Sequence, residues 1–88
     1  MTDPEVTRLR AAIRDVDREL VAALNRRLEL VAKLKRYKDE HGIGFVDRAR
    51  EAALLEERLR ENAGPLSDAG LRAFYVELLE LIKRELDG

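Results

Sequence analysis

Residues 3–42 read DPEVTRLRAAIRDVDRELVAALNRRLELVAKLKRYKDEHG, and this stretch decides the fold. After Pro4 it contains no glycine or proline until Gly42, and its apolar residues recur in steps of three and four, as on one face of a helix. These apolar positions are Val6, Leu9, Ile13, Val16, Leu20, Ala23, Leu24, Val31 and Leu34. Asp3 suits the N-cap, Pro4 the first helical position and Gly42 the left-handed residue after the last turn. The stretch therefore predicts one helix of roughly 36 residues.

The rest of the chain predicts two shorter helices. Asp47 is a natural N-cap for a helix that runs from about residue 48 to residue 62. An Asn-Ala-Gly-Pro breaker follows, and Ser67 or Asp68 then caps a third helix rich in leucine. Phe74 and Tyr75 in this helix are expected in the core. The predicted fold class is all-α, with three helices per chain.

The length and charge of the chain limit the functions it can have. Its 88 residues are predicted to form a single domain over 1–88, because they are too few for two ordinary cores. Lys and Arg total 17 and Asp and Glu 18. The near balance of charge therefore gives no overall electrostatic attraction to nucleic acid or to an acidic membrane surface. No apolar run approaches the roughly 20 residues of a membrane span, and the N-terminus lacks the apolar region of a signal peptide. We therefore expect a cytoplasmic protein that binds neither nucleic acid nor membrane.

Three residue types needed for much of enzyme chemistry are absent or scarce. The chain has no cysteine, which excludes disulfides, thiolate catalysis and cysteine-ligated zinc, and its single histidine excludes a cluster of histidine ligands. There is also only one serine, which leaves little material for a hydroxyl nucleophile. The sequence therefore predicts neither a cysteine-ligated zinc nor a multi-histidine metal cluster.

The three helices differ too much in length to cover one another. At 1.5 Å per residue the first is about 54 Å long and the others roughly 22–30 Å each. A single chain would leave part of the long apolar stripe exposed, which soluble proteins avoid. We therefore predict a homodimer in which the long helices pair, with two-fold symmetry.

Three cations stand at informative places on the predicted long helix. Arg27 occupies a position where the apolar spacing calls for an apolar residue, and Lys38 follows on nearly the same face, roughly 16 Å along the axis. Arg10 is rotated by about 100° and lies roughly 25 Å away, so it reaches a shared small ligand only from the partner chain of an antiparallel dimer. A structural pairing of Arg27 with Asp17 or Glu29 remains open, as does a purely electrostatic role for Lys38 at the helix end.

Several motifs occur in a recognisable order along most of the chain. They are Leu9-Arg10-x-x-Ile13-x-x-Val16-Asp17-x-x-Leu20, Leu24-x-x-Arg27, Lys35-x-x-Lys38, Asp47-x-x-Arg50-Glu51 and Phe74-Tyr75-x-x-Leu78-Leu79-Glu80. In this order the sequence resembles the small, all-helical chorismate mutases (AroQ class), from about Thr7 to Leu86. The resemblance implies an intertwined antiparallel homodimer of three-helix chains. It also implies the cofactor-free Claisen rearrangement of chorismate to prephenate, the branch step toward phenylalanine and tyrosine.

The resemblance also implies roles for individual residues. The implied substrate-binding residues are Arg10, Arg27, Lys38, Asp47, Arg50 and Glu51. Arg27 and the partner's Arg10 each bind one carboxylate, while Lys38 contacts the ether oxygen and a carboxylate. Glu51 and Asp47 hold the ring hydroxyl, Asp47 through its backbone. Arg50 adds positive potential to the pocket. The catalytic residues are thus expected to be Arg10, Arg27 and Lys38.

The sequence departs from the family pattern in the third helix. Many members carry a Gln there as a second donor to the ether oxygen, with a Ser one turn earlier, but the matching positions here are Leu86 and Ile82. Glu85 is adjacent, and some relatives use a Glu that acts only when protonated, in which case activity falls as the pH rises. Without a replacement, Lys38 alone serves the ether oxygen and catalysis is weak, which leaves room for a separate activating protein.

Two other functions remain open at this point. The chain could be a helical dimer with little or no catalysis, acting as a regulatory or binding module, and the absent Gln favours this. The cations kept in an apolar seam argue against it, because a scaffold does not need them. An isochorismate pyruvate-lyase resembles the same family, although the Asp47-x-x-Arg50-Glu51 run favours the mutase.

Overall fold

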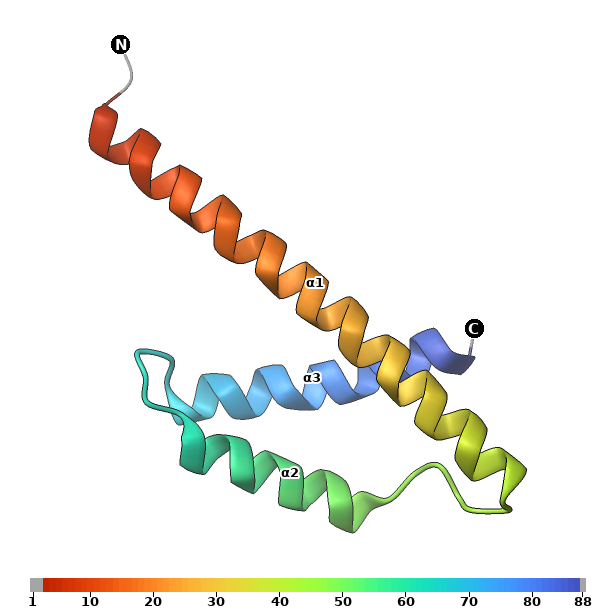
Figure 1. The fold of residues 1–88 in the computed structure, drawn as a ribbon. Coiled ribbons are helices and arrows are strands. Elements are labelled where there is room, and N and C mark those ends of the chain that lie inside the picture. The colour runs from red at the N-terminus through yellow and green to blue at the C-terminus, as the bar shows by residue number, and fades with distance from the viewer. Residues whose placement is uncertain (1–2, 88) are drawn as a thin grey trace. The chain divides into compact units, whose positions relative to one another are not determined.

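The computed structural model describes residues 3–87, which form three helices joined by two loops (Figure 1). Helix α1 spans Pro4–Glu40, α2 spans Arg48–Glu61 and α3 spans Asp68–Asp87. No strand occurs among these described residues, so the predicted all-α, three-helix chain is confirmed. Over the same residues, none of the helices combines the length and the apolar character that a membrane crossing requires.

The chain divides into two compact units, and the boundary falls within α1 between Lys33 and Leu34. In the first unit the helix begins as predicted, because the Asp3 carboxylate accepts hydrogen bonds from the backbone N–H groups of Glu5 (2.8 Å) and Val6 (3.3 Å). The apolar side chains along this part of α1 are exposed in the single chain, and they include Val6, Leu9, Ile13, Val16 and Leu20.

The second unit begins with the last turns of α1, which end in a Schellman motif. The backbone N–H of Ile43 donates to the carbonyl oxygen of Lys38 at 2.8 Å, and that of Gly42 donates to Asp39 at 3.4 Å. Gly42 has a φ of 67°, a left-handed conformation that disfavours residues with a Cβ. The predicted end of the long helix at Gly42 is therefore confirmed.

Helices α2 and α3 lie side by side and run antiparallel in the second unit (Figure 1). The Asp47 side chain caps α2 by accepting from the backbone N–H of Arg50 at 2.9 Å, as predicted. The Ser67 hydroxyl caps α3 by accepting from the N–H of Gly70 at 3.0 Å. Between them, the Asn62 side-chain amide donates to the carbonyl oxygen of Leu66 at 2.8 Å. Each helix start in this hairpin is thus fixed by a short polar side chain.

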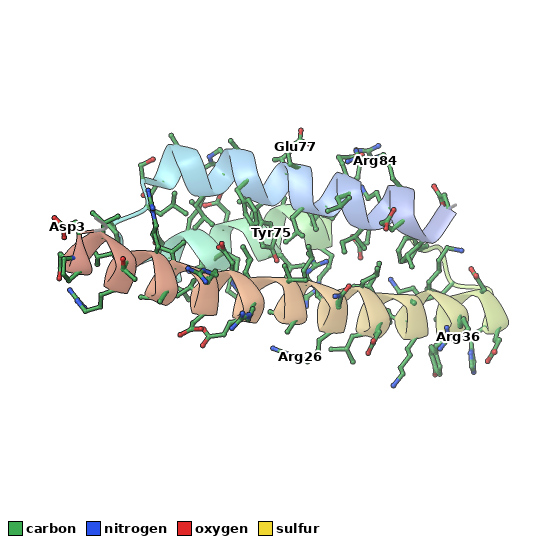
Figure 2. The ribbon with its side chains drawn as sticks, turned by 90° about the horizontal axis from the view of Figure 1, so that it is seen from above. Asp3, Arg26, Arg36, Tyr75, Glu77 and Arg84 are labelled. Carbon is green, nitrogen blue, oxygen red and sulfur yellow. The ribbon has the colours of Figure 1, made fainter. Side chains whose placement is uncertain are left out.

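The two most buried side chains among residues 3–87 both belong to α3. Ile82 is 4% exposed and Tyr75 is 9% exposed. The prediction that Phe74 is also a core residue is wrong for the single chain, where its side chain is 52% exposed. Neighbouring residues on a helix point about 100° apart, so Phe74 and Tyr75 cannot both face the same partner. Figure 2 shows Glu77 and Arg84 on the side of α3 away from Tyr75.

Candidate active site

The predicted site residues are divided between the two units. Arg10 and Arg27 belong to the part of α1 in the first unit, where Arg10 is exposed and Arg27 is half-buried. The other four, Lys38, Asp47, Arg50 and Glu51, belong to the second unit. Each group is described within its own unit.

Two of the three predicted cations of α1, Arg27 and Lys38, are more buried than the arginines nearest to them, and Lys35 is half-buried as well. Arg27 and Lys38 are half-buried, whereas Arg26 and Arg36 are exposed and project from the helix (Figure 2). A long cationic side chain usually keeps its charged head in water, so partial burial at Arg27 and Lys38 needs a reason. The shielding also strengthens the attraction of either cation for an anion, since the effective dielectric constant is lower there.

The loop that leads from Lys38 to Asp47 is held at both ends. At its start, the Schellman motif uses the carbonyl oxygen of Lys38. One turn before Lys38, Lys35 pairs with Asp39 at 3.3 Å, and its ammonium lies 5.7 Å from the centre of the half-buried Phe45 ring. At its end, Asp47 caps α2. The local structure therefore fixes where the last turn of α1 and the first turn of α2 begin and end.

The start of α2 uses two acceptor oxygens of Asp47, one in its side chain and one in its backbone. Its side-chain oxygen accepts from the N–H of Arg50, and its carbonyl oxygen accepts from the N–H of Glu51 at 3.0 Å. A carboxylate engaged at a helix N-terminus is stabilised by the cap and by the helix dipole. The contact of Asp47 with substrate through its backbone stays a prediction, since a carboxylate oxygen and the carbonyl oxygen both serve the start of α2. The side chain of Arg50 is exposed.

Glu51 forms the closest ion pair between α2 and α3 with a residue that the sequence analysis missed. The Lys83 ammonium lies 2.7 Å from a Glu51 carboxylate oxygen and 3.5 Å from Glu80, and the side chains of Lys83 and Glu51 are only 22% and 24% exposed. The hydrogen bond to Glu51 is the main cause that raises the pKa of Lys83; burial opposes it, and the charges of Glu51 and Glu80 add smaller increases. The available signal was that Lys83 follows Ile82, a position the family pattern had already singled out.

The three positions of α3 considered above for the family's second donor have different surroundings. Ile82 is buried, Leu86 is half-buried and Glu85 is exposed. The side chains of Ile82 and Leu86 carry no hydrogen-bond donor, so neither can replace the amide or hydroxyl that many relatives have there. Within residues 3–87, no group of three or more acidic or histidine side chains is arranged to hold a metal ion.

Comparison with known proteins identifies the family. The chain matches the family described as chorismate mutase type II over residues 9–85. The chain belongs to the chorismate mutase type II family. The predicted family, fold class and enzyme class are therefore confirmed, and the chain carries a chorismate mutase domain, an isomerase.

Individual relatives show how far the likeness extends. The T-protein of Haemophilus influenzae is 36% identical over 69 residues, which cover 78% of this chain but 17% of that protein, so the chain spans less than a fifth of it. The 4-amino-4-deoxychorismate mutase of Streptomyces venezuelae is 32% identical over 83 residues, covering 93% of this chain and 77% of that protein.

Solved structures of chorismate mutase from Thermus thermophilus have the same fold. Form I superposes with a TM-score of 0.86 at 29% identity, covering 89% of this chain and 98% of the other. Form II gives a TM-score of 0.89 at 28% identity, covering 94% of each chain. The fold likeness therefore extends over nearly the whole length of those chains.

Proposed function

We propose that this chorismate mutase domain rearranges chorismate to prephenate, the branch step toward phenylalanine and tyrosine. The family match over residues 9–85 carries the proposal, because the matched region includes all six predicted substrate-binding residues. The reaction is a unimolecular Claisen rearrangement that needs no nucleophile, metal or redox group. This suits a chain without cysteine and with one histidine and one serine.

The proposed mechanism begins with conformational clamping. Chorismate carries two carboxylates, and holding both forces the flexible molecule into the compact form in which the reacting carbons are close. Arginine suits this task because its planar guanidinium binds a carboxylate through two parallel hydrogen bonds. Arg27 binds one carboxylate and Arg10 of a second chain binds the other, while Arg50 lines the pocket and adds positive potential.

The second part of the mechanism is electrostatic. Negative charge develops on the ether oxygen as its bond to the ring breaks, and Lys38 supplies a cation at that atom. An interaction that grows in the transition state lowers the barrier, whereas one of equal strength in the ground state does not. The partial burial of Lys38 supports this role, because its charge is shielded less by water than that of its exposed neighbour Arg36.

The proposed active form is an antiparallel homodimer. The exposed apolar stripe of α1 supports it, since side chains such as Val16, which is 60% exposed, have no cover in the single chain. Arg10 lies on the same stretch of α1 and is exposed, so it is accessible to a second chain. Three further predictions from the sequence belong to this proposal. Residues 1–88 form a single domain, the protein is cytoplasmic, and a separate protein activates it.

A second candidate substrate follows from one of the relatives. The protein from Streptomyces venezuelae is named for 4-amino-4-deoxychorismate, which carries an amine where chorismate has its ring hydroxyl. The groups proposed to hold that ring position are the Glu51 carboxylate and the Asp47 backbone. A carboxylate accepts a hydrogen bond from either a hydroxyl or an amine. Both compounds therefore belong in the assay.

The test is to incubate the purified chain with chorismate, with its amino analogue and with isochorismate. Loss of the diene absorbance and formation of prephenate or pyruvate distinguish mutase from lyase. We expect prephenate from chorismate and no pyruvate from isochorismate. If wild-type protein forms prephenate no faster than an Arg27→Ala variant, the proposed function is wrong and a non-catalytic helical module is the better interpretation.

A further inference from the structure

Two ion pairs that join α2 to α3 differ sharply in character. Glu51 and Lys83 lie 2.7 Å apart with side chains 24% and 22% exposed, whereas Glu56 and Arg72 lie 3.6 Å apart with side chains 57% and 54% exposed. The second is an ordinary exposed pair, of the kind that contributes little. The first is shielded, short and placed in the first turn of α2, where Asp47 and Glu51 are proposed to hold the ring hydroxyl.

The pairing with Lys83 changes what the Glu51 carboxylate can bind. One of its oxygens accepts from Lys83, and each carboxylate oxygen has two lone pairs, so it can still accept a hydrogen bond from a hydroxyl. The Lys83 ammonium offsets part of the charge of Glu51, and it also lies 3.5 Å from a Glu80 carboxylate oxygen. A neutral hydroxyl is unaffected by this offset, but a cation placed at the same point meets the positive charge of Lys83 within a few ångströms.

A ring amine would be such a cation. Aliphatic amines are protonated at neutral pH, so the amino analogue of chorismate carries a positive charge where chorismate carries a neutral hydroxyl. Juxtaposing two like charges in a shielded site disfavours binding, and proteins use this repulsion to reject the wrong partner. Lys83 also remains charged at neutral pH, because two acidic neighbours, Glu51 and Glu80, stabilise its ammonium form.

We propose that Lys83 is a specificity-determining residue that selects a ring hydroxyl over a ring amine by pairing with Glu51. This inference rests on the proposed function and narrows its substrate to chorismate. Lys83 acts through Glu51 and through its charge, so we describe it as a positioning residue and not as a catalytic one. Ile82, the adjacent residue, is the most buried side chain among residues 3–87.

The experiment compares the ratio of kcat/KM for chorismate to kcat/KM for its amino analogue. Lys83→Met removes the charge while keeping an unbranched side chain, and Lys83→Gln is a second neutral variant that retains a donor for Glu51. In both, we expect the ratio to move toward the amino analogue by about tenfold or more, because the repulsion is lost. Lys83→Arg keeps the charge, and Arg72→Met breaks the exposed pair, so both are expected to stay within about twofold of wild type.

The possible results separate this inference from the proposed function. If wild type rearranges chorismate but the ratio is unchanged in both neutral Lys83 variants, the specificity role is wrong and the mutase function stands. An equal shift in Arg72→Met would also overturn it, since any loss of an α2–α3 pair would then suffice. If wild type rearranges neither compound, both the function and the inference fail. Circular dichroism of each variant checks that α3 is retained.

Discussion

The carbonyl oxygen of Lys38 accepts a hydrogen bond from the backbone N–H of Ile43 at 2.8 Å, so the residue proposed to serve the ether oxygen also anchors the end of α1. The motif requires Gly42 at a φ of 67°. Placement of the Lys38 side chain is therefore coupled to a single backbone conformation. This coupling gives a first prediction that concerns stability rather than chemistry.

Gly42→Ala should lower the free energy of unfolding by about 1–2 kcal/mol, because a Cβ is disfavoured in the left-handed region. Open space surrounds the position, so the cost comes from the backbone and not from a clash. Gly44→Ala is the matched control, since Gly44 also has open space around it but lies outside the left-handed region. Urea denaturation of the three proteins measures the difference. Equal stability of the two variants would contradict the assignment of the motif.

Arg27→Ala and Lys38→Ala should each reduce kcat/KM by about 10²-fold or more, since each removes a cation that contacts developing or fixed negative charge. The controls are Arg26→Ala and Arg36→Ala, which remove the same kind of charge from exposed positions on the same helix. We expect these controls to lose little activity in a steady-state assay. Comparable losses in all four variants would indicate a general effect of charge and not specific contacts.

Mixing Arg10→Ala chains with Arg27→Ala chains tests whether a site is shared. If Arg10 acts across the dimer, each mixed dimer contains about one intact site, because one pocket receives both arginines and the other receives neither. Activity should therefore reappear on mixing two inactive proteins, provided that their subunits exchange. Absence of recovery after proven exchange would show that Arg10 acts within its own chain or has no part in the site.

Leu86→Gln should raise kcat by about tenfold or more, because it restores a side-chain donor at the position where many relatives carry one. Leu86 is half-buried, and the neighbouring Glu85 is exposed. Glu85→Gln is the matched control and should leave kcat unchanged. If Glu85→Gln lowers activity instead, Glu85 is the donor, and the activity of the wild type should then fall with rising pH.

The Lys83–Glu51 pair should make stability depend on alkaline pH. The pKa of Lys83 is raised in the folded chain, so its stabilisation is fully present below the ordinary lysine pKa of about 10.4 and is lost as the pH rises through the higher folded value. The free energy of unfolding of wild type minus that of Lys83→Met should thus be constant from pH 7 to about pH 10 and shrink above that range. A difference that stays constant in stronger base would contradict the pairing.

The sequence predicted the helices well because their ends depend on local chemistry. Asp3, Asp47 and Ser67 each accept from a backbone N–H two or three residues ahead, and Gly42 adopts the conformation that only a missing Cβ makes easy. These interactions involve neighbours along the chain, so single residues reveal them.

Features that depend on contacts between helices were harder to predict. The pairing of Lys83 with Glu51 requires the register of α3 against α2, which the spacing within either helix does not contain. The same limit explains Phe74, because the pattern of α3 marks it as apolar without showing which way the helix is turned. For the site residues, the sequence supplied their identity by resemblance. Partial burial separates Arg27 and Lys38 from Arg26 and Arg36, but not from Lys35, which is also half-buried.

The exposed apolar side chains in the first half of α1 have a consequence for how the protein folds. A helix of this kind gains most of its stability from packing, and Val6, Leu9, Ile13, Val16 and Leu20 are exposed in the single chain. In the proposed homodimer, assembly and folding would be one event, and the protein concentration would govern how much native structure exists. Dilution alone would disorder this half of the helix.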